Sequence, residues 1–272
     1  MQDERNRSLP LRSVANAREL GGYPACDGRH VRSGLLLRTA HLGDICAKDI
    51  GVLTDRYHVE TVIDFRMEME MKGFEDPAVD GVRYHHLDVI DLQMLPDIKG
   101  SEDIDFGRMN LAEMVRFSEM AGMMDERMYI GFLSNEKGKR AFERFFRILL
   151  DASPDRAVLW HCTGGKDRTG IAAMLLLSVF GSDEETILYD YLLTNRYNAA
   201  RIAGTKQHLH AAGYDDAFCE KAVLLFDGVD ERYMRRALAF LNQRYGSVLG
   251  YIRDELGISD DEMDTLRAKY LA

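Results

Sequence analysis

Apolar residues follow two different patterns along the chain, and the pattern changes after residue 160. Before that point, short strand patterns alternate with longer helical patterns. The strand patterns cover residues 29–38, 60–65, 82–87 and 157–160, and the helical patterns cover residues 43–57 and 139–150. In the second helical pattern, Phe142, Phe145 and Phe146 share one face. This alternation predicts an α/β fold with a mainly parallel central sheet flanked by helices.

Beyond residue 170 the pattern is helical throughout. The run 171–177 predicts a buried helix that ends near Phe180, with Gly181 at its C-terminal cap. Further helices are predicted from the capping box at residue 182 towards residue 202, over 231–245, over 247–256, and from the capping box at residue 259 onwards. No repeat or Pro/Gly-rich linker interrupts the order, so we expect one domain over residues 1–272.

The most informative segment joins these two parts and reads His-Cys-Thr-Gly-Gly-Lys-Asp-Arg-Thr-Gly, residues 161–170. A strand pattern precedes it and the buried helix follows it, which places Cys162 in a strand-to-helix turn. Backbone amides in such a turn and the positive end of the helix dipole converge on an anion. The segment therefore predicts a phosphate-binding loop.

The residue types in this loop suit phosphate hydrolysis. Cys162 attacks phosphorus as a thiolate, which a helix N-terminus and a nearby guanidinium favour. Arg168 follows six residues later, and its planar fork can hold two phosphate oxygens. Gly164 and Gly165 permit positive φ angles that turn amides inward.

The remaining loop residues have supporting roles in this interpretation. We also expect Thr163, Lys166 and Asp167 to contribute to phosphate binding, because they lie in the loop. Thr169 is expected to donate its hydroxyl to Cys162, and His161 to order the loop by hydrogen bonding. Cys-x5-Arg alone is a weak signal, and its alternative is a buried structural cysteine in an ordinary loop. The strand, the glycines and the apolar helix around it favour the phosphate loop.

These ten residues resemble the signature of bacterial protein tyrosine phosphatases related to the secreted mycobacterial and listerial enzymes. That family uses His-Cys-x-x-Gly-Lys-Asp-Arg-Thr-Gly. Residues 18–23, Arg-Glu-Leu-Gly-Gly-Tyr, are similar to its N-terminal element, with Glu19 in place of the usual Asp, and residues 27–32 continue that similarity. Residues 61–66, 190–195 and 245–247 match other segments, so the resemblance covers most of the chain except about 92–128. It implies a cysteine-phosphatase-like fold that acts on phosphotyrosine and, in several members, on phosphoinositides.

A leaving alkoxide or phenoxide needs a general acid, and two carboxylates are candidates. Asp91 follows the 82–87 strand at the position where dual-specificity phosphatases carry their acid, and its alternative is a solvated loop carboxylate. Asp167 lies inside the loop, and its alternative is structural hydrogen bonding. Asp64 is expected to organise the sheet end through Arg66 or Arg38 rather than to act in catalysis. A Trp-Pro-Asp loop is absent from the sequence, since Trp160 is its only tryptophan.

Lys166 occupies a place where related phosphoinositide phosphatases carry lysine. They usually carry a second lysine directly after the cysteine, where this chain has Thr163. The main prediction is therefore a phosphotyrosine or phosphoprotein phosphatase that forms a cysteinyl-phosphate. A phosphoinositide or other small phosphomonoester phosphatase is the first alternative, and a phospho-binding module without activity is the second. Partners are then a phosphorylated protein or phosphoinositide substrate, with the oligomeric state open.

Composition limits the remaining possibilities. The net charge of −10 disfavours nucleic acid as a partner, and no apolar run predicts a transmembrane segment. Four cysteines, at positions 26, 46, 162 and 219, show neither metal-ligand spacing nor disulfide density, and His85 and His86 have no ligand partner spacing. We expect no metal and no cofactor, and a reducing, cytoplasmic setting by default, with secretion open if a leader was removed.

Residues 92–128 stand apart from this order. Methionines alternate there with acidic residues and glycines, a composition that suits a surface able to repack. The resemblance implies a lid over the active site, formed by this region and the helices after the loop. A peripheral helical insertion is the equally weighted alternative.

Overall fold

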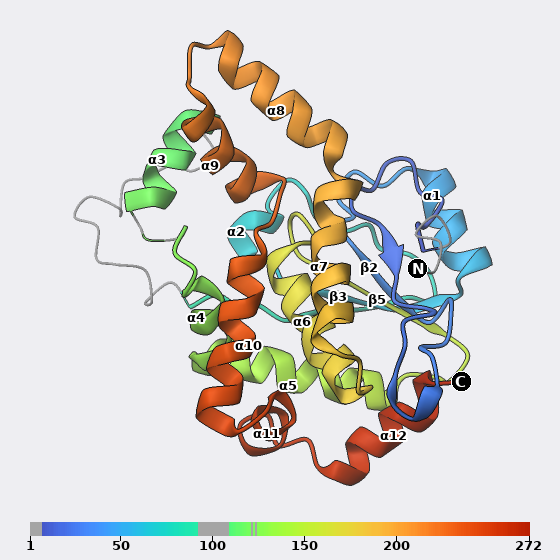
Figure 1. The fold of residues 1–272 in the computed structure, drawn as a ribbon. Helices are drawn as coiled ribbons and strands as arrows, with labels where there is room; N and C mark the ends of the chain where they lie inside the picture. Colours follow the sequence, from blue (N-terminus) through green and yellow to red (C-terminus); the bar gives the residue numbers. More distant parts are fainter. Residues whose placement is uncertain (1–6, 92–108, 121, 123) are drawn as a thin grey trace.

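The computed structural model describes residues 7–91, 109–120, 122 and 124–272 (Figure 1). Its described strands form one five-stranded sheet in the order β1-β2-β5-β3-β4. The strands are β1 (Arg18–Glu19), β2 (Leu36–Thr39), β3 (Val59–Asp64), β4 (Arg83–His86) and β5 (Ala157–His161). Only β1 pairs antiparallel, with β2; the other three pairings are parallel. The predicted α/β fold with a mainly parallel sheet is confirmed.

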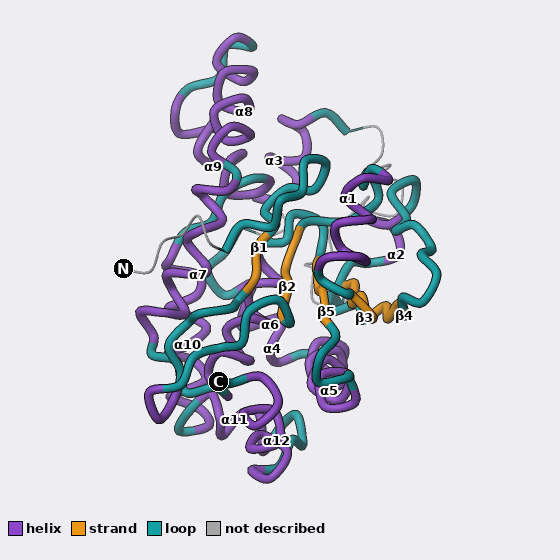
Figure 2. The backbone as a smooth tube through the Cα atoms, turned by 90° about the vertical axis from the view of Figure 1, so that its right-hand side faces the viewer, coloured by secondary structure: helices purple, strands orange, loops and turns teal. Residues whose placement is uncertain are grey.

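Side chains alternate across the sheet and bury both of its faces, as expected for a central parallel sheet. One face carries Leu36, Ile63, Val158 and Trp160 into the larger core. The opposite face carries Leu37, Val62 and Leu159 into a smaller core with the N-terminal segment. Figure 2 shows the strands with α1 on one side and α5 on the other.

Helices account for most of the remaining described chain. On the smaller-core side lie α1 (Ala47–Gly51) and a π-helical turn, η3 (Val52–Arg56). A 3-10 turn, η2 (Cys26–Gly28), lies against the larger core through Cys26. The others are α2 (Glu68–Met71), α3 (Leu111–Met120), α4 (Met128–Ser134), α5 (Glu136–Asp151), α6 (Asp167–Val179), α7 (Glu184–Tyr197), α8 (Ala199–Ala211), α9 (Asp216–Phe226), α10 (Glu231–Tyr245), α11 (Val248–Asp254) and α12 (Asp260–Tyr270). Described helices all fall short of the combined length and apolarity needed to span a membrane.

Most predicted elements are present, with four differences. Helix α6 begins at Asp167 rather than after Gly170, so the second half of the predicted loop is the first helical turn. The helix from residue 182 divides at Asn198 into α7 and α8, and Asp183 caps it by accepting from the Thr186 amide. The strand predicted over 29–38 is shorter and ends one residue later, at Leu36–Thr39, while Val31 makes an isolated bridge to Leu271.

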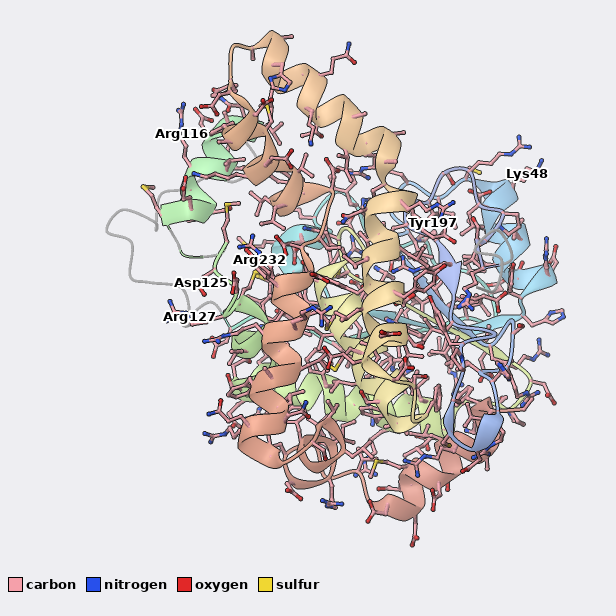
Figure 3. All side chains as sticks on the ribbon, viewed as in Figure 1. Lys48, Arg116, Asp125, Arg127, Tyr197 and Arg232 are labelled. Atoms are coloured by element: carbon pink, nitrogen blue, oxygen red, sulfur yellow. The ribbon has the colours of Figure 1, made fainter. Side chains whose placement is uncertain are left out.

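Helices α8 and α9 project away from the sheet, and α3 lies against α9 (Figure 1). A separate small core joins them through Val115, Leu209 and Cys219. Arg116 of α3, labelled in Figure 3, lies over the rings of Tyr214 and Phe218 at 5.9 Å each. Residues 92–108, the first part of the suggested lid, lie outside the described residues.

Candidate active site

Cys162 lies at the carboxyl edge of the sheet, directly after β5. The pairing register places Thr39, His161, Asp64 and His86 side by side at that edge. The chain then forms a short loop and enters α6 at Asp167. Cys162 is 1% exposed, because the apolar residues of β5 and α6 on either side anchor the loop in the larger core. The predicted strand-loop-helix placement of the cysteine is confirmed.

Backbone carbonyls of the loop point away from its centre. The His41 amide donates to the Thr163 carbonyl at 3.1 Å, and Asn16 Nδ2 donates to the carbonyls of Gly164 and Gly165 at 3.1 and 2.9 Å. In a trans peptide the N–H points opposite to the C=O. The amides of residues 164–166 therefore face the inside of the loop, as an anion-binding site requires.

Gly165 alone has the left-handed conformation that both glycines were predicted to provide. Its φ is 63°, and a Cβ there would lie 2.1 Å from the Thr39 carbonyl oxygen. Gly164 lacks a positive φ, and a Cβ there would meet only Lys166 side-chain carbons and the Phe226 oxygen, at 3.5–3.6 Å. The close approach of β2 to the loop explains the glycine at position 165.

A buried network below the loop explains the arginine of the N-terminal Arg-Glu-Leu-Gly-Gly element. Arg18 Nε donates to Asp190 Oδ1 at 3.0 Å, and Arg38 donates both to Asp190 and, at 2.9 Å, to the Gly165 carbonyl. Asn16 lies between Arg18 and the loop. Burial would raise the pKa of Asp190, but the charges of Arg18 and Arg38 outweigh burial and lower it. The network ties the loop to β1, β2 and α7.

Arg168 is held by a carboxylate that the sequence analysis did not identify. Its two terminal nitrogens donate to Glu70 Oε2 and Oε1 at 2.6 and 2.7 Å, and Nη1 also donates to the Phe65 carbonyl at 3.1 Å. Thr163 Oγ1 donates to the same Glu70 carboxylate at 2.6 Å. Burial opposes ionisation of Glu70, but Arg168 and the hydrogen bonds lower its pKa to about 2.

No local signal in the sequence marks Glu70. It lies in α2, a single helical turn in an alternating Met/Glu segment, 98 residues before Arg168. The Met67 amide donates to Glu70 Oε2 at 2.8 Å and fixes the side chain from its own helix. Burial lowers the pKa of Arg168, but Glu70, Cys162 and Asp167 outweigh it, and the net shift is upward. The guanidinium of Arg168 is therefore charged and held in one position before any substrate binds.

His161 is buried among charged groups and orders the base of the loop, as predicted. Its Nε2 lies 2.7 Å from Asp76 Oδ2, and its Nδ1 lies 3.2 Å from the Cys162 carbonyl. Arg66 pairs with Asp64 at 2.7 Å and with Asp76 at 3.0 Å. Asp64 therefore organises the sheet end through Arg66, the first of its two predicted partners. Burial would raise the pKa of Asp76, but the hydrogen bond and charge of His161, together with Arg66, lower it.

Asp64, Asp76 and His161 also form a cluster whose ligand atoms lie close enough for a metal ion. The Arg66 guanidinium already forms ion pairs with both carboxylates of this cluster. A divalent cation would have to displace that buried charge, so the donor set fits a structural ion-pair network better than a metal centre.

Asp167 takes part in a hydrogen-bonded chain away from the loop. The Tyr129 hydroxyl of α4 lies 2.6 Å from Asp167 Oδ1 and 2.7 Å from the Tyr191 hydroxyl of α7. Burial, Asp167 and Tyr191 raise the pKa of Tyr129, which keeps it a donor. The Lys166 ammonium lies 3.4 Å from the other Asp167 oxygen.

Lys166 turns towards α9 in this structure. Its ammonium is buried and donates to the Leu224 carbonyl at 2.6 Å and to the Gly228 carbonyl at 3.0 Å. Leu224 lies in the last turn of α9, where the negative end of the helix dipole favours a cation. The ammonium thus links the loop to α9.

The predicted hydrogen bond from Thr169 to Cys162 is not formed. Thr169 Oγ1 is buried and has no hydrogen-bond partner in the described structure, while its carbonyl accepts from Trp160 Nε1 at 3.2 Å. The side chain lies in the first turn of α6 rather than in a loop free to adjust.

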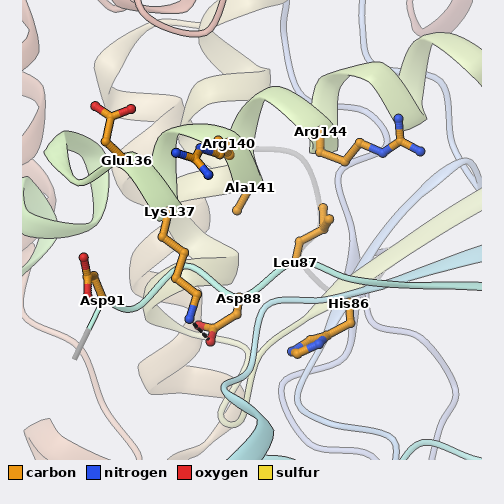
Figure 4. A pocket seen from close by; sticks show the side chains of 9 residues that line it. All are labelled: His86, Leu87, Asp88, Asp91, Glu136, Lys137, Arg140, Ala141 and Arg144. Atoms are coloured by element: carbon orange, nitrogen blue, oxygen red, sulfur yellow. Dashed lines mark hydrogen bonds and ion pairs between the residues drawn. The ribbon is translucent and has the colours of Figure 1, made fainter. Parts of the chain in front are cut away.

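Asp91 lines a cavity of about 500 Å³ between the 86–91 segment and α5 (Figure 4). Residues 161–170 do not line this cavity. His86 lines it too, and its Nε2 lies 2.6 Å from the Arg66 carbonyl. His85 is half-buried, and burial with Arg144 and Arg83 lowers its pKa.

Known proteins similar to this chain agree with the geometry. A family model described as the tyrosine phosphatase family matches residues 9–272. A Cupriavidus necator protein named as a tyrosine-protein phosphatase is 30% identical over 264 residues, 97% of this chain and 88% of that protein. The triple specificity protein phosphatase PtpB of Mycobacterium tuberculosis is 31% identical over 157 residues, 55% of this chain and 54% of PtpB.

A tyrosine-protein phosphatase of Nostoc commune is 33% identical over 141 residues, 50% of this chain and 45% of that protein. Among solved structures, P. aeruginosa TpbA is 17% identical, with coverage of 82% and 98% of the two chains and a TM-score of 0.27. That superposition is too poor to bear on fold or function. Because the family match spans almost the whole sequence, this chain belongs to the tyrosine phosphatase family and is a phosphoric monoester hydrolase.

Proposed function

We propose that this member of the tyrosine phosphatase family hydrolyses phosphotyrosine in proteins, with Cys162 as the nucleophile. The observation that carries the proposal is the buried Cys162 at the entry to α6, enclosed by inward amides and by an Arg168 already fixed by Glu70. Preorganised donors stabilise the charge that develops on the transferring phosphoryl group without reorganising during the reaction.

Two displacements complete the proposed reaction. Cys162 Sγ forms a bond to phosphorus while the bond to the ester oxygen breaks, and that oxygen leaves with a proton from a general acid. Water then attacks phosphorus, the phosphorus–sulfur bond breaks, and inorganic phosphate leaves. Arg168 holds two non-bridging oxygens throughout. Loop amides hold the third.

For the general acid we propose Asp91. The alternative, Asp167, is engaged by Tyr129 and faces Lys166 on its other oxygen. Asp91 lines the cavity beside α5, so acting on the leaving group requires its carboxylate to turn towards the loop.

We propose proteins rather than phosphoinositides as substrates, and the reason is the position of the Lys166 ammonium. A phosphoinositide phosphatase would use this lysine to bind a second phosphate of the lipid headgroup, whereas the Lys166 ammonium is bound by the carbonyls of Leu224 and Gly228. All four cysteines are free, and we propose that the enzyme acts in a reducing compartment where the nucleophile is not oxidised. We also propose that residues 1–272 act as one catalytic unit.

Replacing Cys162 tests the proposal. Cys162→Ser should abolish hydrolysis of p-nitrophenyl phosphate and of a phosphotyrosyl peptide, while tungstate binding measured by calorimetry stays within about threefold. A serine hydroxyl keeps the volume of the thiol but is scarcely ionised at neutral pH. Trapping of 32P-phosphate on the wild-type protein, and not on the variant, would identify the intermediate. Turnover by Cys162→Ser at the wild-type rate would refute the mechanism.

A further inference from the structure

The cavity between α5 and the 86–91 segment combines charges in an unusual way. Figure 4 shows α5 along one side and the 86–91 segment along the other. Asp88 is paired with Lys137, and Glu136 is paired with Lys139 at 3.0 Å. The third carboxylate, Asp91, is not free either. The acidic groups of the cavity are therefore occupied.

Two arginines that line the same cavity have no ion-pair partner among the described residues. Arg140 and Arg144 lie one helical turn apart on α5, are exposed, and line the cavity. Neither makes a hydrogen bond or ion pair with the residues that the structure describes. Guanidinium groups pair preferentially with carboxylate and phosphate oxygens in a bidentate way. Their guanidinium groups turn in opposite directions along α5 (Figure 4), so the cavity offers two separate positions for an anion.

This cavity lies at the same edge of the sheet as the phosphate loop. His161 is in register with Asp64 of β3, and Asp64 is in register with His86 of β4, which lines the cavity. With strands about 4.8 Å apart, the cavity begins about 10 Å from the end of β5. An extended peptide covers the distance to His86, where the cavity begins, in about three residues at about 3.3 Å per residue.

We propose that Arg140 and Arg144 each offer a position for an acidic group of the substrate, a carboxylate or a second phosphate, about three residues from the phosphorylated tyrosine. This proposal rests on the proposed phosphotyrosine phosphatase activity and names a feature of its substrates. Ordinary solvation of surface arginines is the alternative. Their position in one cavity beside the active site, on a chain with a net charge of −10, favours binding, since the overall field repels acidic substrates and a local cationic site is needed to select them.

Four substrates and three proteins test this proposal. The substrates are p-nitrophenyl phosphate and phosphotyrosyl peptides whose residues three positions before and after the tyrosine are Gln, Glu or phosphoserine. The proteins are the wild type, R140Q/R144Q, and the control R56Q/R156Q. The control loses the same charge from exposed arginines that lie just before β3 and β5, at the opposite edge of the sheet.

We expect wild-type kcat/KM to be at least about fivefold higher for the Glu or phosphoserine peptides than for the Gln peptide. R140Q/R144Q should lose this preference and keep wild-type kinetics on p-nitrophenyl phosphate, while the control variant keeps both. The relative rates of the Glu and phosphoserine peptides distinguish carboxylate from phosphate.

Equal wild-type kinetics on the three peptides, or a preference retained in R140Q/R144Q, would overturn the proposal and leave the phosphatase activity standing. An equal loss on all four substrates would also overturn it, because the arginines would then act through the fold. Absence of wild-type hydrolysis on every substrate would instead remove the proposed function, and this inference with it.

Discussion

Glu70 shows how one buried carboxylate prepares a cation for catalysis. It accepts from both terminal nitrogens of Arg168, from Thr163 and from the Met67 amide. Four donors on one carboxylate fix the position of the guanidinium. An arginine held in this way loses little further side-chain entropy when phosphate binds.

Glu70→Gln is expected to lower kcat/KM for p-nitrophenyl phosphate by about tenfold. The amide keeps the shape but removes the charge that fixes Arg168, and removing one partner of a buried pair is costly. Steady-state kinetics at pH 6 check this. Unchanged kinetics would mean that Phe65 and the loop hold Arg168 without Glu70.

The Glu70→Gln variant should also differ from the wild type in how its free energy of unfolding depends on pH. The pKa of Glu70 falls from 4.5 to about 2 on folding, so its contribution is fully present above pH 4.5 and is lost as pH falls towards 2. The free energy of unfolding of wild type minus Glu70→Gln should be constant from pH 7 to 5 and shrink below about pH 4.5. Urea melts at several pH values measure it. A difference that does not change with pH would contradict the assignment.

The identity of the general acid is a further question at this scale. If Asp91 protonates the leaving group, Asp91→Asn should slow an alkyl or tyrosyl phosphate at least about tenfold more than an ester with a strongly acidic leaving group. The comparison is kcat/KM over esters of graded leaving-group pKa, with Asp167→Asn as the matched variant. The variant whose kcat/KM depends more steeply on leaving-group pKa has lost the general acid. A flat dependence in Asp91→Asn would rule out Asp91.

At the scale of elements, the loop is shaped by the strand next to it. Gly165→Ala should lower Tm by several degrees and reduce kcat/KM at least about tenfold, because φ is positive and the new Cβ would lie 2.1 Å from the Thr39 oxygen. Gly164→Ala is the control, since its closest contacts are 3.5–3.6 Å. Thermal melts and kinetics of both variants are the measurements. Equal effects of the two substitutions would mean that the loop is not pressed against β2.

The elements that sequence predicts well are those with strong local periodicity. The short strand patterns of β3 and β5, the phenylalanine face of α5, the extent of α10 and the capping box of α12 were all evident in the chain. Within the site, Cys162, His161 and the pairing of Asp64 with Arg66 were predictable because they lie in one contiguous motif or one strand end.

Contacts between distant segments could not be predicted. Glu70 and Asp76 reach the loop from 98 and 85 residues away, and nothing near them in the sequence indicates their partners. Lys166 and Thr169 carried roles suggested by their place in the motif, but side-chain direction depends on where α6 begins and on what lies beside it. Packing decides both, and packing is not visible in a local pattern.

On the scale of the whole molecule, side-chain contacts join the loop and the start of α6 to helices α4 and α9. Tyr129 links α4 to Asp167, and Lys166 links the loop to the end of α9, against which α3 packs. Near the start of α10, Arg232 pairs with Asp230 at 2.7 Å and Glu126 at 3.3 Å, close to the Asp125–Arg127 pair (Figure 3). Tyr129 and Lys166 thus connect the loop and the start of α6 to α4 and α9 through a few polar contacts.

Lys166→Met tests whether these contacts couple the loop to α9 (Asp216–Phe226), which projects from the sheet together with α8. The variant keeps the aliphatic stem but removes the donor to the Leu224 and Gly228 carbonyls. Because both carbonyls then lack that buried donor, amide hydrogen exchange in residues 216–226 should rise several-fold, with residues 260–270 unchanged as an internal control. Exchange followed by mass spectrometry on both proteins is the measurement. If exchange in 216–226 stays at the wild-type level, and only KM for a substrate with a second phosphate rises, Lys166 instead leaves α9 to bind phosphate, as its place in the motif first indicated.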